Sequence, residues 1–492
     1  MIRRVDTAHT PESLVGLIPP GSRAVLLRSQ GEISRKARYS LVTGWPFLSF
    51  RSWGAQCRLE CEGRRIQQYG DPWLSLATLV ARYEMGDSVD VPFPLGGCFG
   101  SWGYDLKGFL EPTVGRRAAH DLALPDCDLG FYDSLVVFDH VEGVVLVVAT
   151  GIRPDGSRSA RAEQEQVGRW LRLLETSPRE GEIGVDAARG VVGVPGPEPR
   201  GSMSRESYLR AVVTAQSYIR SGDIYQVNIS HRLSRPWRGD SWGLYRQLSS
   251  LSPAPFGAWM DFGDYGLVSS SPELFMLMSG GRVETRPIKG TRPRDADPVR
   301  DAQLSYELQS SDKERAELLM ITDLLRNDLG RVCDYGTVRV PDLLRLERYA
   351  QVQHLVSTVE GQLRSDVSHF QALAACFPGG SITGAPKIRA MQIIDELEPV
   401  SRGPYTGALG YLGFNRESQL SIAIRVALVR EGIAYYHAGA GIVADSDPVA
   451  EYEETLVKAA AFRQLQDIGV VGEGDGRGVR VGGAMSGGDV GF

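Results

Sequence analysis

Two pairs of glutamates have the spacing that places side chains on one face of a helix. Glu314 and Glu317 form one pair, Glu451 and Glu454 form the other, and Lys458 follows one helical turn after Glu454. Residues three or four apart are neighbours on a helix surface. Brought together, the two faces would offer four carboxylates to Mg²⁺, which prefers carboxylates, substrate oxygens and water. Two solvated helix faces are the alternative, since Glu–Lys pairs at this spacing are common surface features.

A single lysine could serve as a nucleophile. Lys289 lies between Ile288 and Gly290 in the segment Arg286–Thr291. Poor solvation lowers the pKa of a lysine, and the neutral amine can attack carbon. An exposed lysine in a turn is the alternative reading of the same residues.

Two glycine-rich stretches could bind anions. Residues 379–387 lead into an expected helix with Pro386 at its first position, where free backbone N–H groups suit an anion. No Ser or Thr follows Lys387, so this is not a phosphate-binding Walker A loop. Residues 439–444 match G-x-G-x-x-A, but Asp445–Pro448 interrupts the helix that a dinucleotide site requires. Small residues after a strand can still expose N–H groups to a carboxylate.

The composition is that of an ordinary globular protein. The chain has 492 residues, 42% hydrophobic and 23% charged, and a formal net charge of -6. The basic residues are scattered, which argues against a nucleic-acid partner. There is no run of about 18 apolar residues, so no membrane span is expected. Six cysteines without a zinc-like cluster, and no apolar signal segment after Arg3–Arg4, indicate reduced thiols in a cytoplasmic protein.

The expected elements divide the chain into four parts. Residues 1–175 alternate short strands with turns, residues 176–204 form a Gly- and Pro-rich linker, residues 205–465 carry the stronger periodicities, and residues 466–492 form a Gly-rich tail expected to be disordered. Strands are predicted at 24–27, 134–138, 144–149, 421–429 and 432–437, the last two forming a hairpin that turns at 430–432. Helices are predicted at 205–221, 313–325, 385–397 and 449–465. Residues 96–104, rich in glycine and aromatics, predict a crowded strand.

Taken together in this order, the motifs resemble the chorismate-utilising enzyme family, which includes anthranilate, aminodeoxychorismate and isochorismate synthases. The resemblance is strong over 205–465 and weaker over 20–150. The segments that carry it are 221–228, 271–273, 286–294, 323–331, 377–387, 424–425 and 438–458. The fold that the resemblance implies is α+β, with large antiparallel sheets packed orthogonally, helices outside, and chorismate buried between sheet and helices.

The resemblance also implies a role for each site residue. The four glutamates would surround Mg²⁺, which would bridge to the ring carboxylate of chorismate. Glu273 matches the general acid that protonates the departing 4-hydroxyl, and His354 matches a histidine that anthranilate synthases need. Arg425 would clamp the enolpyruvyl carboxylate. The other residues expected to contact the substrate are Tyr405, Gly441, Lys458, Thr291, Thr383 and Gln226.

Two positions distinguish among the reactions of the family. Isochorismate and salicylate synthases carry a water-activating lysine where Gln226 stands, so hydroxylation is disfavoured. Anthranilate synthases typically carry alanine where Lys289 stands, whereas lysine is typical of aminodeoxychorismate synthases. The resemblance then implies that neutral Lys289 adds to C2 of chorismate while Glu273 protonates the 4-hydroxyl, and that ammonia then attacks C4.

The expected partner is a separate glutamine amidotransferase subunit that supplies ammonia, because no Cys–His nucleophile arrangement stands out in the chain. Two alternatives remain open. One is an anthranilate synthase component I, and the other is a non-catalytic regulator that binds chorismate or tryptophan. The retained acidic residues, together with Glu273 and Lys289, argue against the regulator.

A second pocket is implied in the N-terminal half. Residues 26–29 and 252–256 resemble the segments that cradle tryptophan in this family, with Ser29, Pro253 and Phe256 as the expected lining. The sequence departs from the usual patterns at Arg28 and Ser252. These departures argue against feedback inhibition by tryptophan.

Overall fold

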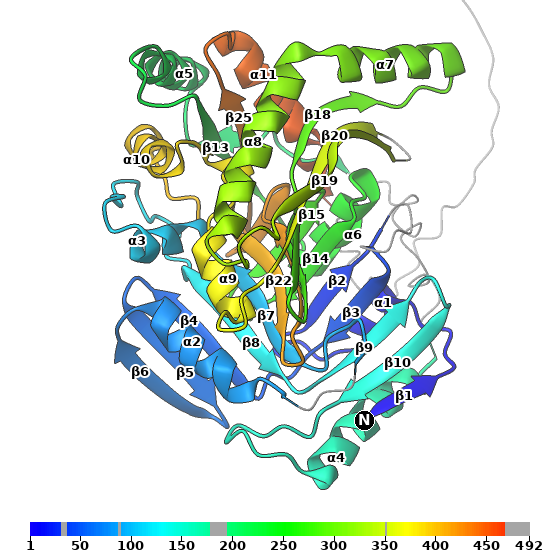
Figure 1. The fold of residues 1–492 in the computed structure, drawn as a ribbon. Helices are drawn as coiled ribbons and strands as arrows, with labels where there is room; N and C mark the ends of the chain where they lie inside the picture. Colours follow the sequence, from blue (N-terminus) through cyan, green and yellow to red (C-terminus); the bar gives the residue numbers. More distant parts are fainter. Residues whose placement is uncertain (31–36, 87–89, 178–193, 350–351, 468–492) are drawn as a thin grey trace, which may run out of the picture.

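Two large antiparallel sheets with helices packed around them make up the fold (Figure 1). The structure is a computed structural model, which describes residues 1–30, 37–86, 90–177, 194–349 and 352–467. Each large sheet has 12 strands. The predicted α+β class with antiparallel sheets and outer helices is confirmed.

The first sheet runs from the N-terminal strand to the strands of the C-terminal half. In spatial order it contains β1 (Ile2–Val5), β10 (Val144–Ala149), β9 (Ser134–Asp139), β3 (Tyr39–Thr43), β2 (Val25–Arg28), β14 (Phe256–Asp261), β15 (Gly266–Ser271), β24 (Val426–Arg430), β25 (Ile433–Ile442), β13 (Gln226–Pro236) and β12 (Arg200–Gly201), and β21 (Gly384–Ala385) also pairs with β13.

The second sheet also combines strands from both halves of the chain. In spatial order it contains β18 (Ile288–Pro293), β20 (Val352–Gln362), β17 (Arg282–Arg286), β16 (Leu274–Ser279), β23 (Glu417–Ile422), β22 (Ala408–Gly413), β7 (Gly97–Trp102), β8 (Cys127–Tyr132), β4 (Leu48–Trp53), β5 (Gln56–Cys61) and β6 (Arg64–Tyr69), and β19 (Arg339–Arg348) also pairs with β20. Two short strands, β11 (Val194–Pro195) and β26 (Gln466–Asp467), pair separately.

The helices cover the outer faces of the sheets. They are α1 (Pro11–Val15), α2 (Pro72–Tyr83), α3 (Lys107–Leu110), α4 (Ala160–Leu174), α5 (Arg205–Arg220), α6 (Ser241–Leu251), α7 (Pro298–Ser310), α8 (Asp312–Gly330), α9 (His369–Cys376), α10 (Lys387–Leu397), α11 (Pro448–Lys458) and α12 (Ala460–Arg463), with single 3₁₀ turns η1 at Tyr104–Leu106 and η3 at Gly380–Ile382.

Strands from the two halves of the chain alternate within both sheets. In the first sheet β2 pairs with β14, and in the second β7 pairs with β22. The predicted regions 1–175 and 205–465 therefore do not correspond to separate sheets. Most of the predicted linker lies outside the described residues, and β11 and β12 lie within its last part.

Apolar side chains fill the space between the sheets and the space beneath the helices. One buried cluster combines Val25, Leu41 and Val137 of the first sheet with Phe99 and Tyr411 of the second. Another packs α1, α4 and α6 onto the first sheet. β9 and the second half of β10 are thus buried on both faces, which explains why these strands consist of nearly continuous apolar residues.

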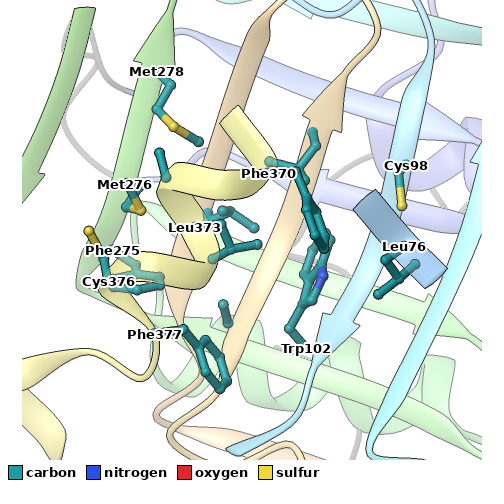
Figure 2. Close-up of a cluster of buried hydrophobic side chains, with 14 of the residues drawn as sticks. Leu76, Cys98, Trp102, Phe275, Met276, Met278, Phe370, Leu373, Cys376 and Phe377 are labelled. Carbon is teal, nitrogen blue, oxygen red and sulfur yellow. The ribbon is translucent and has the colours of Figure 1, made fainter. Parts of the chain in front are cut away.

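The outer face of the second sheet is closed by α2 and α9 (Figure 2). Phe370 and Leu373 of α9 point toward Trp102 of β7, and Met276 of β16 lies beside the same helix. The predicted crowded strand at 96–104 is β7, where a Cβ on Gly100 would lie 2.2 Å from the Asp128 carbonyl oxygen. Only glycine permits this approach of β7 to β8.

The predicted strand at 421–429 is wrong as a single element. Residues 417–422 belong to β23 in the second sheet, and residues 426–430 belong to β24 in the first. The chain changes sheet at Arg425, whose φ is 51°. The apolar run hides this change because both strands are buried. The predicted hairpin at 430–432 is confirmed, since β24 pairs with β25.

The helix predictions hold with altered ends. The helices predicted at 205–221 and 313–325 are α5 and the longer α8. Pro386 caps α10 from outside rather than occupying its first position, because residues 384–385 form β21. The helix predicted at 449–465 is divided into α11 and α12 at Ala459. Gln466–Asp467, predicted to begin the disordered tail, form β26, and the rest of the tail lies outside the described residues.

The predicted chemistry of the cysteines and the predicted lack of a membrane span agree with the structure. All six cysteines are free thiols. Among the described residues, no helix has the length and apolar character needed to cross a bilayer.

Candidate active site

Gly441 lies on β25 where Gln226 and Lys289 converge. A Cβ on Gly441 would lie 2.5 Å from Gln226 Nε2 and 3.6 Å from Lys289 Nζ. Gln226 begins β13, whereas Lys289 comes from β18 of the other sheet. The structure therefore brings together three residues that the sequence separates widely, and a Cβ at position 441 would overlap the Gln226 amide and contact the Lys289 amine.

The Lys289 amine points into a group of acidic side chains. Its Nζ lies 3.6 Å from Glu317 Oε2 on α8, and the lysine side chain is only 18% exposed. Its positive charge also acts on Glu273 and Glu454, lowering the pKa of each carboxyl. The amine thus faces the site and not bulk solvent.

Glu273 is a buried carboxyl on the connection between β15 and β16. Burial raises its pKa to about 7, against the opposing effects of a hydrogen bond with Ser381 and the charges of Lys289 and Lys458. A carboxyl with this pKa carries a proton on a large fraction of molecules at neutral pH. It is therefore suited to protonate a leaving group.

The four predicted glutamates lie in the first two turns of α8 and α11. Ser311 caps α8 by accepting a hydrogen bond from the Glu314 N–H, and Asp447 caps α11 with Pro448 at its first position. The helices are adjacent, because Lys313 Nζ of α8 lies 3.8 Å from Glu451 Oε1 of α11. One ion pair thus links α8 to α11, and Lys289 acts on a carboxylate of each helix, Glu317 and Glu454.

Each of the four carboxylates lies beside a cation of the chain. Glu314 lies 3.6 Å from Arg292, Glu317 3.6 Å from Lys289, Glu451 3.8 Å from Lys313, and Glu454 2.7 Å from Lys458. Burial, reinforced by the negative charge of the neighbouring glutamate, raises the pKa of Glu314 and of Glu451. At Glu454 the opposite holds: burial acts to raise the pKa, but Lys458 outweighs it.

The donor set has the chemistry that Mg²⁺ prefers. It consists of hard carboxylate oxygens, and two of the four carboxylates have pKa values raised by burial and mutual repulsion, which a bound cation would relieve. Ser446 fixes one of them, since its hydroxyl donates to Glu451 Oε1 at 2.6 Å. Ordered waters would have to complete the coordination, as is usual for Mg²⁺.

Another cluster has closer metal-like spacing but is occupied by an arginine. Within the described ranges, Asp105, His120 and Asp126 bring one ligand atom each within 4.8 Å of one another. Arg116 donates to Asp126 Oδ1 at 2.7 Å and lies 3.2 Å from His120 Nε2. The guanidinium neutralises this cluster, so we assign no metal to it.

Arg425, His354 and Thr291 lie close to one another. Thr291 Oγ1 and His354 Nδ1 are 2.9 Å apart. Burial and, secondly, the charge of Arg425 lower the pKa of His354 to about 4. His354 is therefore neutral at pH 7, and the positive charge beside it belongs to Arg425.

Tyr405 and Lys458 border the same strand as Gly441. The Tyr405 hydroxyl lies 3.0 Å from the position that a Cβ on Gly439 would take, and Lys458 Nζ donates to the Gly439 carbonyl at 3.0 Å. Thr383 differs from these two residues. It is fully buried, and its hydroxyl donates to the Gly379 carbonyl at 3.1 Å. This hydrogen bond therefore stabilises the glycine-rich turn.

Comparison with known proteins places the chain in a family. A model of the chorismate binding enzyme family matches residues 36–464. The chain belongs to this family. It is 37% identical over 479 residues to anthranilate synthase component 1 of Acetivibrio thermocellus, covering 94% of each chain. It is 43% identical over 437 residues to aminodeoxychorismate synthase component 1 of Klebsiella aerogenes, covering 88% of this chain and 92% of that one.

A solved chorismate-utilising relative has the same fold. The crystal structure of anthranilate synthase component I from Streptococcus pneumoniae superimposes with a TM-score of 0.75 at 30% identity, covering 93% of this chain and 98% of that one. Relatives of similar identity carry two different names, so family membership establishes a chorismate-utilising enzyme and leaves the individual reaction to the site residues.

Four polar residues of this chorismate-utilising site escape prediction from the sequence. They are Ser381, Arg292, Lys313 and Ser446. Ser381 lies inside the glycine-rich stretch that the sequence offers for anion binding. Its hydrogen bond with Glu273 follows only from the approach of that turn to β16 in the folded chain. Lys387 of the same stretch binds Asp328 at 2.6 Å, which makes it structural.

A separate, partly open pocket between the sheets lies where the tryptophan pocket is predicted. Ser29 and Phe256 line it, together with Tyr39 and Tyr411. Pro253 is not among its lining residues, whereas Pro255, directly before β14, is. Arg28 also lies at its wall, where its Nε donates to Glu12 at 2.6 Å.

Proposed function

We propose that this protein is the chorismate-aminating component of an aminodeoxychorismate synthase, which replaces the 4-hydroxyl of chorismate with an amino group. The observation that carries the proposal is the place of the Lys289 amine, beside Gly441 and Gln226 and within electrostatic reach of Glu273. A nucleophile and a proton donor are thus available in one largely buried site.

The first chemical step forms a covalent adduct. Neutral Lys289 adds to C2 of chorismate, the two ring double bonds shift, and the C4–O bond breaks. The proton of Glu273 passes to the departing hydroxyl, which leaves as water. The pKa of about 7 at Glu273 supports this role, because the carboxyl can both hold and release a proton near neutral pH.

The second step reverses the first with a different nucleophile. Ammonia adds to C4, the double bonds return, and the C2–N bond to Lys289 breaks. Lys289 departs as the neutral amine, and the attacking nitrogen, now an ammonium, returns one proton to the Glu273 carboxylate, which restores the acid. The sum is chorismate plus ammonia giving 4-amino-4-deoxychorismate plus water, with the lysine regenerated.

The remaining residues hold the substrate. Arg425 suits a carboxylate because its planar fork can donate two hydrogen bonds, and neutral His354 beside it adds no competing charge. Glu314, Glu317, Glu451 and Glu454 would hold Mg²⁺, which when bound supplies positive charge for the ring carboxylate.

The ammonia comes from a partner in this proposal. The relatives named above are each called component 1. We infer a separate glutamine amidotransferase as the second component. The chain alone should accept ammonium salts and should give no turnover with glutamine.

Anthranilate synthase is the second candidate, favoured by the 37% identity to one such enzyme over nearly the whole chain. Without a lysine nucleophile, ammonia itself would add at C2, and loss of pyruvate would give anthranilate. Lys289 stands against this reading, since a lysine nucleophile in the site would itself add at C2 and so direct ammonia to C4.

The test is incubation with chorismate, Mg²⁺ and an ammonium salt, with products identified by mass and pyruvate measured separately. We expect aminodeoxychorismate without pyruvate release. Lys289→Ala should lose this product while remaining folded, because the side chain ends in the site and contributes little to the core. Unchanged C4 amination in the variant would exclude the covalent route, anthranilate from the parent would exclude the proposed function, and lack of any turnover would favour the non-catalytic regulator.

A further inference from the structure

A fully buried ion pair lies behind the substrate-facing strands. Glu398 follows α10, and Arg402 lies four residues later, with side chains 3% and 1% exposed. The two groups meet through two hydrogen bonds, Arg402 Nε to Glu398 Oε2 at 2.9 Å and Nη2 to Oε1 at 2.7 Å. The guanidinium carbon also lies 4.7 Å from the Tyr104 ring centroid and 5.6 Å from that of Tyr405.

All five N–H groups of the guanidinium have acceptors. Beyond the two bonds to Glu398, Arg402 donates from Nη2 to the Asn228 carbonyl at 2.7 Å, and from Nη1 to the Ile382 carbonyl at 3.2 Å and to Thr406 Oγ1 at 3.1 Å. These acceptors belong to β13, to the glycine-rich turn and to the turn after α10. One planar group therefore ties three separate segments together.

The carboxylate holds β13 at a second point. Glu398 Oε1 accepts from the Ser230 N–H at 2.7 Å and from the Ser230 hydroxyl at 2.9 Å. Arg402 thus binds Asn228, and Glu398 binds Ser230, two residues further along the same strand. The place of β13 along its own direction, and with it the place of Gln226 two residues earlier, depends on both charges.

The three tied segments are the ones that carry site residues. Gln226 is on β13, Tyr405 precedes Thr406, and Ser381, the hydrogen-bond partner of Glu273, precedes Ile382. We propose that the Arg402–Glu398 pair positions the chorismate site by fixing these three segments relative to one another. This inference rests on the proposed function only in taking the cluster around Lys289 and Gly441 as the place where chorismate binds.

Stability alone is a poor reason for such a pair. Removing two charges from water is costly, and an apolar pair of similar volume often stabilises a core as well or better. What an apolar pair cannot do is orient five donors in one plane. A lysine at position 402 keeps the charge but has no planar fork, so it cannot serve all three segments.

The test is Arg402→Lys, measured as chorismate consumption with saturating ammonium and Mg²⁺. We expect the KM for chorismate to rise roughly tenfold or more and kcat to fall, because small misplacements of binding groups weaken both substrate and transition-state contacts. The KM for ammonium should change little.

The matched control is Arg23→Lys. Arg23 pairs with the buried Asp128 in the N-terminal half, away from the three tied segments, with side chains 15% and 1% exposed. Both variants should lower Tm, but only Arg402→Lys should raise the KM for chorismate. An unchanged KM and kcat in Arg402→Lys, or an equal rise of KM in Arg23→Lys, would overturn the inference.

Two further variants keep the test decisive if Arg402→Lys does not fold. Ser230→Ala removes only one hydroxyl contact to Glu398, and Arg402→Met with Glu398→Met removes both charges together. Each should raise the KM for chorismate in the folded protein, the double variant more. Parent-like KM values in both would refute the positioning role. Chorismate consumption is scored whichever carbon is aminated, so failure of the proposed product and failure of this inference are separable.

Discussion

Glu273 is the residue whose chemistry is most clearly set by its surroundings. Its carboxyl is buried, and its pKa is raised to about 7, so the protonated form needed by a general acid is available at neutral pH. Glu273→Gln keeps the shape but has no acidic proton. We expect kcat/KM for chorismate to fall by about 10²–10⁴-fold, as measured by steady-state kinetics.

The pH dependence follows from the direction of the same shift. Because the acid must be protonated, kcat/KM should decline as pH rises through about 7, and this decline should be absent in Glu273→Gln. The folded protein also retains a proton that the unfolded chain releases above pH 4.5. Stability should therefore fall between pH 4.5 and 7, by at most about 3 kcal/mol.

The control for Glu273 is Glu417, the first residue of β23. Burial raises the pKa of this carboxyl as well, and Ser279 donates to it at 2.6 Å. Glu417→Gln should leave the pH profile of activity unchanged. A loss of the alkaline decline in Glu417→Gln, or its persistence in Glu273→Gln, would contradict the assignment of the acid.

At the scale of elements, the close approach of the Gln226 side chain of β13 to β25 depends on a glycine. A Cβ at Gly441 would overlap Gln226 Nε2 at 2.5 Å, whereas Lys289 Nζ would lie at ordinary contact distance, 3.6 Å. Gly441→Ala should raise the KM for chorismate about tenfold or more with little change in Tm, because the displaced group is the polar end of a side chain. Gly330→Ala, where no atom lies within 4 Å, is the control. Similar kinetics for the two variants would speak against the site.

The start of α11 depends on a hydrogen-bond relay. Gln216 of α5 donates to the Ser446 carbonyl at 2.7 Å, and the Ser446 hydroxyl holds Glu451 at 2.6 Å. Partners that orient a metal ligand typically affect affinity by about 10–100-fold. We expect Ser446→Ala to weaken Mg²⁺ by about tenfold, measured both by Mg²⁺ titration of activity and by direct binding of Mn²⁺.

The control for this relay is Ser217→Ala, since the Ser217 hydroxyl donates only to carbonyls of its own helix among the described residues. Metal affinity should be unchanged in this variant. Equal Mn²⁺ binding in the parent and in Ser446→Ala would remove the proposed role of the relay.

At the scale of the whole molecule, the two halves of the chain are joined through backbone ladders. Removing residues 1–175 would leave β14 and β22 without the partners β2 and β7 in the middle of the sheets. Such unpaired central strands expose both backbone groups and apolar faces. We expect a fragment of residues 205–467 to aggregate or remain unfolded, and the full chain to unfold in one calorimetric transition. A soluble, cooperatively folding fragment would show instead that the halves are independent.

The sequence predicts well whatever depends on near neighbours. The spacing of Glu314 with Glu317 and of Glu451 with Glu454 is a property of one helical turn. The same is true of the hairpin between β24 and β25. Motif order over the catalytic half was sufficient to indicate the family, which the comparisons confirm.

What the sequence could not predict are the partners of these residues. The break at Arg425 was missed because buried strands of two different sheets read as one apolar run. Three contacts join positions that are far apart in the chain. They are those of Lys289 with Gly441, of α8 with α11, and of Arg402 with Asn228 and Ile382. Local spacing determined which side chains could act. Only the packing of the two interleaved sheets decided which of these side chains share a site. The reason is that contacts between distant segments are set by the burial of whole faces and not by any short sequence pattern.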